Sequence, residues 1–196
     1  MYPGKYAAAH PDRAAFVMAS TGESVSYAEF EVRANRLAHL LRHEGLRRQD
    51  HYSIMMENND RYLEACAAGE RAGLYYTCIN SYLTADELAY ILDNSESQIL
   101  ITSMSKLEVA IDAVAQSSKV RKVLVVDAGA NELPDGFEDY ASACHSFPAT
   151  PIDNERLGTS MLYSSGTTGR PKGIIRPLPE QPPADALPMY DFLGQL

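Results

Sequence analysis

The order of apolar and polar positions predicts a chain in which short buried strands alternate with amphipathic helices. Short apolar runs bounded by glycine, asparagine or charged residues are typical of strands, whereas apolar residues spaced three and four apart indicate the buried face of a helix. The runs that predict strands cover 14–19, 52–56, 74–79, 98–102 and 122–126. Four helices are predicted between them, and two of these begin at capping boxes, Ser26-Tyr-Ala-Glu29 and Thr84-Ala-Asp-Glu87. Asn58 or Asn59 is expected to cap the second helix, and the fourth covers 106–115.

This alternation predicts an α/β fold. Parallel strands need crossover connections, which are usually helices, so we expect a mainly parallel sheet with helices on both faces. Four segments are expected along the chain: an α/β core at 1–127, a surface connection at 128–158 with a short helical piece at 137–144, a strand–loop–strand unit at 159–176, and a proline-rich segment at 177–196. Because the last residues turn apolar again before Leu196, we expect a truncated domain.

Composition narrows the possible partners. The chain has 17 Lys and Arg against 26 Asp and Glu, a net charge of −9, which argues against a nucleic-acid partner. An anionic ligand would therefore have to be held by a local motif. We find no membrane-spanning run and no export signal, so a cytoplasmic protein is expected. The three cysteines show neither a disulfide framework nor a metal-ligand spacing, so they are interpreted as small buried hydrophobes and no metal site is predicted on the chain.

One segment carries a clear chemical signal, the sequence Tyr163-Ser-Ser-Gly-Thr-Thr-Gly-Arg-Pro-Lys-Gly173. Its glycines allow the backbone to approach a ligand closely, its hydroxyl groups are donors without bulk, and Lys172 adds a positive charge. Oligophosphate binding needs these properties together. The spacing differs from the Walker A motif, in which the lysine follows a glycine and precedes Ser or Thr, so a P-loop kinase is not indicated.

The same eleven residues resemble the phosphate-loop signature of the AMP-forming acyl-CoA synthetase, luciferase and adenylation-domain superfamily. Upstream segments resemble the N-terminal region of those enzymes in order and spacing: Ser26–Phe30, Arg33–Ala38, Glu57–Asn59, Ala72–Leu74, Ile79–Asn80 and Leu83–Leu88. The resemblance covers nearly the whole chain, and among subfamilies it is greatest to fatty acyl-CoA synthetases. It implies that this chain is the N-terminal part of the large domain of such an enzyme.

The resemblance also implies a reaction and a set of site residues. A carboxylic acid, most simply a fatty acid, would react with ATP to give an acyl-adenylate and pyrophosphate, and coenzyme A would then capture the acyl group as a thioester. Mg²⁺ would bind through the ATP phosphates. The residues implied to bind the β- and γ-phosphates are Ser164, Ser165, Gly166, Thr167, Thr168, Gly169 and Lys172. The catalytic residues would lie downstream of Leu196, so we expect the 196-residue chain alone to be inactive.

Two alternatives remain open from the sequence. The chain could be a non-catalytic, shortened relative that dimerises or binds nucleotide, and a homodimer is possible in either case. It could also derive from another carboxylate activator, such as an aryl-CoA ligase or an adenylation domain. The histidines show no pairing with a nucleophile and receive no role. Asp86 and Glu87 are interpreted as charges that stabilise a helix start.

Overall fold

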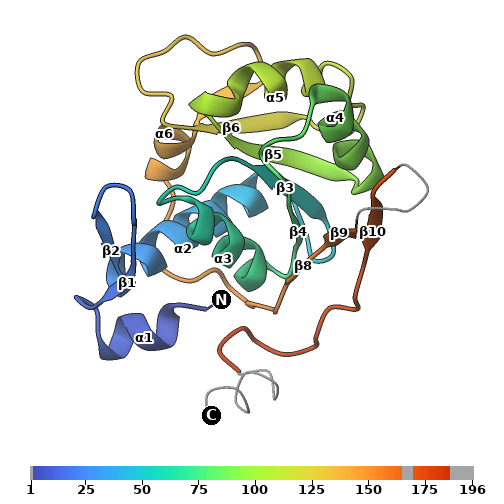
Figure 1. Cartoon of the computed structure of the whole chain (residues 1–196). Coiled ribbons are helices and arrows are strands. Elements are labelled where there is room, and N and C mark those ends of the chain that lie inside the picture. Colours follow the sequence, from blue (N-terminus) through green and yellow to red (C-terminus); the bar gives the residue numbers. More distant parts are fainter. Residues whose placement is uncertain (1, 165–169, 186–196) are drawn as a thin grey trace.

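The centre of the protein is a six-stranded parallel sheet, seen in a computed structural model that describes residues 2–164 and 170–185 (Figure 1). The strand order is β7-β6-β5-β3-β4-β8, and every neighbouring pair is parallel. The strands are β3 (His51–Met55), β4 (Tyr75–Cys78), β5 (Ser97–Ser103), β6 (Lys122–Val126), β7 (Phe137–Asp139) and β8 (Thr159–Ser160). The predicted α/β fold with a mainly parallel sheet is confirmed.

Helices cover both faces of this sheet (Figure 1). They are α2 (Tyr27–His43), α3 (Tyr62–Ala72) and α6 (Tyr140–His145) on one face and α4 (Ala85–Asn94) and α5 (Leu107–Val114) on the other. Because successive strand residues point to opposite faces, each central strand contributes to two apolar cores. In β5, for example, Ile99 and Ile101 pack with α2 and α3, whereas Leu100 packs with α4 and α5. The nearly continuous apolar runs of these strands follow from burial on both sides.

Both predicted capping boxes are present. The Ser26 and Thr84 hydroxyls accept from the backbone N–H of Glu29 and Glu87, and each glutamate carboxylate accepts from the backbone N–H of its cap. The prediction that Asn58 or Asn59 caps α3 is wrong, since α3 is preceded by Arg61 and has no side-chain cap. The Asn59 side chain instead accepts from the N–H of Arg61, 2.9 Å away, and shapes the turn before the helix.

Three smaller features differ from the sequence expectation. The expected helical piece at 137–144 begins as β7, which pairs with β6 at the sheet edge, and becomes α6 only where the Asp139 carboxylate accepts from the N–H of Ser142. The expected strand at 159–163 divides into β8 in the main sheet and β9 (Leu162–Ser164) outside it. Cys78 is exposed, although Cys66 and Cys144 are buried as expected.

The remaining elements are short and lie outside the six-stranded sheet. The helix α1 (Gly4–Ala9) and the antiparallel pair β1 (Ala14–Val17) and β2 (Ser24–Ser26) precede α2, a 3₁₀ turn η1 (Met104–Lys106) precedes α5, and β10 (Lys172–Ile174) pairs with β9. Within the described ranges, none of the helices has the length and apolar character needed to cross a bilayer.

Candidate phosphate-binding site

The two strands that flank the predicted phosphate loop form an antiparallel pair, β9 and β10 (Figure 1). In this pair Ser164 lies opposite Lys172, Tyr163 opposite Gly173, and Leu162 opposite Ile174. Opposed residues of antiparallel strands project on the same face, so the Ser164 hydroxyl and the Lys172 ammonium lie on the same side of the β9–β10 pair. We call this strand pair, with the adjoining Arg170 and Pro171, the loop base. The other predicted site residues, Ser165, Gly166, Thr167, Thr168 and Gly169, lie outside the described residues.

Helix α4 holds the loop base at two points, one on each strand side. The Tyr163 hydroxyl donates to Asn94 Oδ1 at 2.8 Å, and the Tyr90 hydroxyl donates to the carbonyl oxygen of Pro171 at 3.1 Å. The Arg170 guanidinium also lies over the Tyr90 ring, 5.1 Å from its centroid. The positions of Ser164 and Lys172 therefore depend on a helix about 80 residues earlier in the sequence, as the Tyr90–Pro171 separation of 81 shows.

Tyr163 packs against its opposite residue, which explains why a glycine occupies position 173. A Cβ atom on Gly173 would overlap the end of the Met161 side chain and would approach the Tyr163 ring to 3.1 Å. Burial is the main cause that raises the pKa of Tyr163 to about 12, so its hydroxyl stays protonated and keeps donating to Asn94. The aromatic ring and its hydrogen bond together stabilise the base of the loop.

The chain reaches the loop from the carboxyl end of the parallel sheet. Strand β8 pairs with β4, the N–H of Met161 donates to the carbonyl of Tyr76 at 2.9 Å, and the chain then leaves the sheet as β9. Just before β8, a Cβ on Gly158 would overlap the carbonyl oxygens of Gly69 and Leu74, so only glycine fits this crossing of α3 and β4. Ligands of open α/β sheets bind beyond the carboxyl ends of the strands, and the chain enters β9 at that end.

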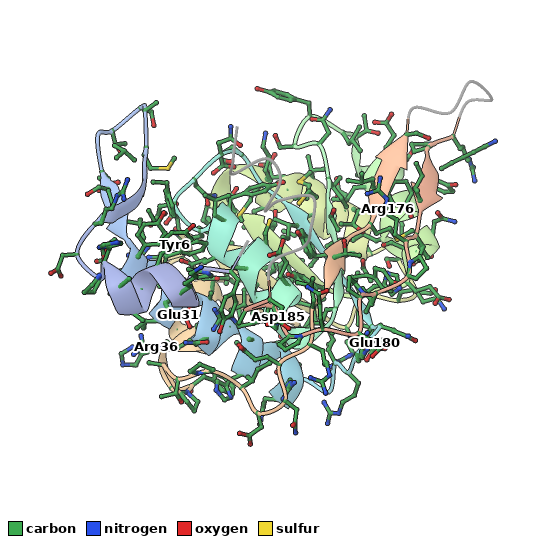
Figure 2. The ribbon with its side chains drawn as sticks, turned by 90° about the horizontal axis from the view of Figure 1, so that it is seen from below. Tyr6, Glu31, Arg36, Arg176, Glu180 and Asp185 are labelled. Atoms are coloured by element: carbon green, nitrogen blue, oxygen red, sulfur yellow. The ribbon has the colours of Figure 1, made fainter. Side chains whose placement is uncertain are left out.

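The segment that follows β10 returns along the same edge of the protein. The Tyr75 hydroxyl donates to the carbonyl of Arg176 at 2.7 Å, and Arg48 forms an ion pair of 2.9 Å with Glu180. Figure 2 shows Arg176 beside the β9–β10 pair and Glu180 farther along this segment. Leu178 is buried with Tyr75 and Met161 in a small apolar cluster. The chain therefore packs onto β4 both just before β9, at Met161, and just after β10, at Arg176 and Leu178.

The charges at the loop base suit an anionic ligand. Lys172 and Arg170 are both exposed, and neither forms an ion pair with any residue in the described ranges 2–164 and 170–185. Because the whole chain carries a charge of −9, attraction for a phosphate would have to come from local groups, and these cations and the Ser164 hydroxyl are of the suitable kind. The chain can thus offer hydrogen-bond donors and positive charge from opposite strands to a single oligophosphate.

Sequence reasoning found the loop but missed the residues that position it. Tyr90 and Asn94 are four residues apart on one face of α4, but this spacing alone does not tell a loop anchor from a core or surface pair. Two of the histidines have structural contacts: His39 bonds to the carbonyl of Thr150 at 2.9 Å, and His51 stacks on Tyr75 with ring centroids 4.8 Å apart. Glu87 serves the helix start as expected.

Comparison with known proteins shows which family has a sequence like this one. The sequence model of the AMP-binding enzyme family matches residues 5–177. The 3-oxocholest-4-en-26-oate–CoA ligase of Rhodococcus rhodochrous is 32% identical over 169 residues, covering 84% of this chain and 30% of that protein. The long-chain-fatty-acid–CoA ligase of Thermus thermophilus is 33% identical over 158 residues, covering 79% of this chain and 28% of that protein.

A solved structure agrees with the fold. A protein of Rhodopseudomonas palustris, provisionally assigned as a long-chain-fatty-acid CoA ligase, superposes with a TM-score of 0.74 at 22% identity, over 87% of this chain and 42% of that one. Of the curated relatives described above, by contrast, the chain spans about 30% of the length. The family match covers the six-stranded sheet, the β9–β10 pair and the loop between them. The chain therefore belongs to the AMP-binding enzyme family.

Proposed function

We propose that the complete protein is an acid–CoA ligase that activates a carboxylic acid with ATP and transfers the acyl group to coenzyme A. The observation that supports this most directly is the loop base, where Ser164 and Lys172 face each other across β9 and β10 in a chain of the AMP-binding family. The carboxylate attacks the α-phosphorus of ATP, pyrophosphate leaves, and the thiol of coenzyme A then displaces AMP from the acyl-adenylate.

The loop acts on the leaving group in this proposal. Negative charge grows on the β- and γ-phosphates as the bond to the α-phosphorus breaks, and donors already in place for that charge lower the barrier. Lys172 supplies the ammonium and Ser164 a hydroxyl, and we propose that Ser165, Gly166, Thr167, Thr168 and Gly169 complete the binding site. We place Mg²⁺ on the phosphates of ATP, where it would neutralise part of the same charge.

The proposed substrate is a hydrophobic carboxylic acid, most simply a fatty acid. Relatives with about 30% identity are named as ligases of medium- and long-chain fatty acids and of 3-oxocholest-4-en-26-oate, a sterol-derived acid. These acids share a carboxylate at the end of a large apolar group. An aryl acid is the competing substrate class, and the experiment below separates the two.

Pyrophosphate exchange into ATP, measured on the complete protein with one acid at a time, tests the reaction. We expect exchange that depends on a fatty acid, and a loss of about 10²-fold in Lys172→Ala because a charge that stabilises the leaving group is removed. Lys119→Ala is the matched control, since Lys119 is an exposed lysine after α5 and should leave the rate unchanged.

Three outcomes would contradict parts of the proposal, and a fourth would change only the substrate class. Formation of ADP instead of AMP would show that a different phosphate bond of ATP is broken. If no carboxylic acid of any class supported exchange, a non-catalytic nucleotide-binding protein would be favoured. Exchange with aryl acids alone would keep the reaction and correct the substrate. A Lys172→Ala variant as active as Lys119→Ala would remove the role proposed for Lys172.

A further inference from the structure

Two cysteines from neighbouring elements meet at the surface of the protein. Cys66 lies in α3 and Cys78 is the last residue of β4, and their sulfur atoms are 3.7 Å apart. A disulfide has an S–S distance of about 2.0 Å, so the sulfurs need to approach by less than about 2 Å to bond. Side-chain rotation can provide a movement of this size, because α3 and β4 are joined by a tight turn and already pack together.

The two thiols differ in access to solvent. The Cys78 side chain is exposed, whereas Cys66 is only 7% exposed within the core between α3 and the sheet. An oxidant in solution therefore meets the exposed Cys78 before the buried Cys66. The third cysteine, Cys144, lies in a different helix, α6, and is buried in the apolar core.

The surroundings of Cys78 favour its reactive form. The pKa of the Cys78 thiol is lowered to about 7, because Cys66 and Tyr62 donate hydrogen bonds to its sulfur. These bonds outweigh the opposing effect of the protein atoms that surround the sulfur, although the residue as a whole is exposed. The same shared hydrogen bond, together with burial, raises the pKa of Cys66. Thiolates rather than thiols are the nucleophiles, so Cys78 carries the reactivity and Cys66 keeps its proton near neutral pH.

We propose that Cys78 and Cys66 form an oxidative modification site, in which a hydroperoxide oxidises Cys78 and Cys66 converts the product to an intramolecular disulfide. In the first step the Cys78 sulfur attacks one peroxide oxygen and the O–O bond breaks. Cys78 becomes a sulfenic acid, and the other oxygen leaves and takes up a proton as water or an alcohol.

In the second step the Cys66 sulfur attacks the Cys78 sulfur. The S–S bond forms, the S–O bond breaks, and the hydroxide leaves as water with the Cys66 proton. The two thiols thereby lose two electrons and two protons, and one hydroperoxide is reduced. A thiol reductant reverses the change. The reaction needs neither ATP nor a carboxylate, so it can be tested independently of the proposed ligase function.

The test is peptide mapping of the wild-type protein after treatment with equimolar hydrogen peroxide at pH 7. We expect a 66–78 cross-link, lighter by two hydrogen atoms than the two thiol peptides, and the loss of the free thiols of Cys66 and Cys78. Cys144 should remain a thiol, since burial is the main cause that raises its pKa to about 12. Dithiothreitol should restore the Cys66 and Cys78 thiols.

Variants separate the roles of the two cysteines. Cys66→Ser should stop the reaction at a Cys78 sulfenic acid that dimedone traps, whereas Cys78→Ser should leave Cys66 unreacted, and Cys144→Ser should behave as wild type. Tyr62→Phe should slow oxidation at pH 7 several-fold, because it removes a donor that stabilises the thiolate. A cross-link that includes Cys144, or wild-type protein in which Cys78 is oxidised no faster than Cys144 and no 66–78 bond forms, would overturn the proposal.

Discussion

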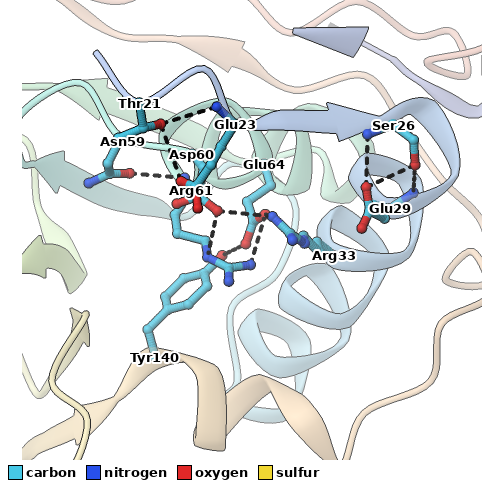
Figure 3. Close-up of polar contacts among 10 residues, drawn as sticks. All are labelled: Thr21, Glu23, Ser26, Glu29, Arg33, Asn59, Asp60, Arg61, Glu64 and Tyr140. Atoms are coloured by element: carbon cyan, nitrogen blue, oxygen red, sulfur yellow. Dashed lines mark hydrogen bonds and ion pairs between the residues drawn. The ribbon is translucent and has the colours of Figure 1, made fainter. Parts of the chain in front are cut away.

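At the residue scale, Glu64 is a carboxylate that is almost completely removed from water. It lies on α3, is 1% exposed, and accepts from the Tyr140 hydroxyl at 2.8 Å (Figure 3). Arg61 and Arg33 approach its other oxygen to 3.6 and 3.8 Å, distances at which the ion pairs are loose. Burial raises the pKa of Glu64 to about 7, and the two arginines and Tyr140 oppose this effect only in part.

This shift predicts how stability depends on pH. In the unfolded chain the carboxyl titrates near its ordinary value of 4.5, but in the folded protein it holds its proton up to about pH 7. The folded state therefore binds more protons between these values, and the stability contributed by protonated Glu64 is lost as pH rises through 7. Relative to Glu64→Gln, the unfolding free energy of the wild type should fall by up to about 3 kcal/mol between pH 4.5 and 8.

Urea unfolding at a series of pH values measures this difference. Glu108→Gln, at an exposed carboxylate on α5, is the matched control and should follow the wild-type profile. If Glu64→Gln and wild type keep a constant difference across this range, Glu64 is not protonated in the folded protein near neutral pH.

At the element scale, helix α4 has a capped N-terminus and contacts the loop base through residues near its C-terminus. Its first turn is held by the Thr84 capping box, and its second half supplies Tyr90 and Asn94 to the two sides of the loop base. A loose α4 would therefore loosen the contact of β9 and β10 with the rest of the protein. Helix α2 has the same kind of cap at Ser26, and it packs on α3 and α6.

The two capping boxes make a matched pair of substitutions. Thr84→Ala and Ser26→Ala should each lower the unfolding free energy by about 1 kcal/mol, because each leaves helix N–H groups without an acceptor. Only Thr84→Ala should speed amide hydrogen exchange in β9 and β10. Equal exchange in the two variants would show that α4 does not position the loop.

At the scale of the whole molecule, the buried Arg71 joins segments that are distant in sequence. It is fully buried on α3 and forms hydrogen bonds of 3.0 and 2.6 Å with the two carboxylate oxygens of Glu31 on α2. Glu155, which precedes β8, lies 3.6 Å away, and the Tyr2 ring lies 5.2 Å from the guanidinium carbon. One side chain thus links the N-terminus, two helices and the segment that leads to the loop.

Removing this link should destabilise the fold strongly. Arg71→Met leaves two carboxylates without their cation, so we expect a loss of about 3–5 kcal/mol in urea unfolding. Arg121→Met breaks a partly exposed ion pair with Glu44 and should cost no more than about 1 kcal/mol. Glu31→Met added to Arg71→Met should recover part of the loss, and a loss in Arg71→Met no larger than in Arg121→Met would contradict this role.

Most of the fold could be predicted from local signals, whereas the support of the site could not. The capping boxes at Ser26 and Thr84 and the apolar runs that form β3 and β6 depend on residues close in sequence, and all were found there. By contrast, β7 has only three residues and is a strand because β6 offers it an edge. The division of 159–163 into β8 and β9 likewise depends on β4, which pairs only with the first part.

The sequence by itself determined that the chain is α/β and that it resembles adenylate-forming enzymes, and it predicts a phosphate-binding loop at 163–173. These properties depend on periodicity, local capping and the order of small, hydroxylic and charged residues. All three arise from interactions between residues that are close in the sequence. Only the tertiary structure decided that Ser164 faces Lys172, that Tyr90 and Asn94 hold the loop base, and that Cys66 meets Cys78. These contacts form between elements that become neighbours only when the sheet assembles. The spacing of the residues along the sequence therefore does not predict them.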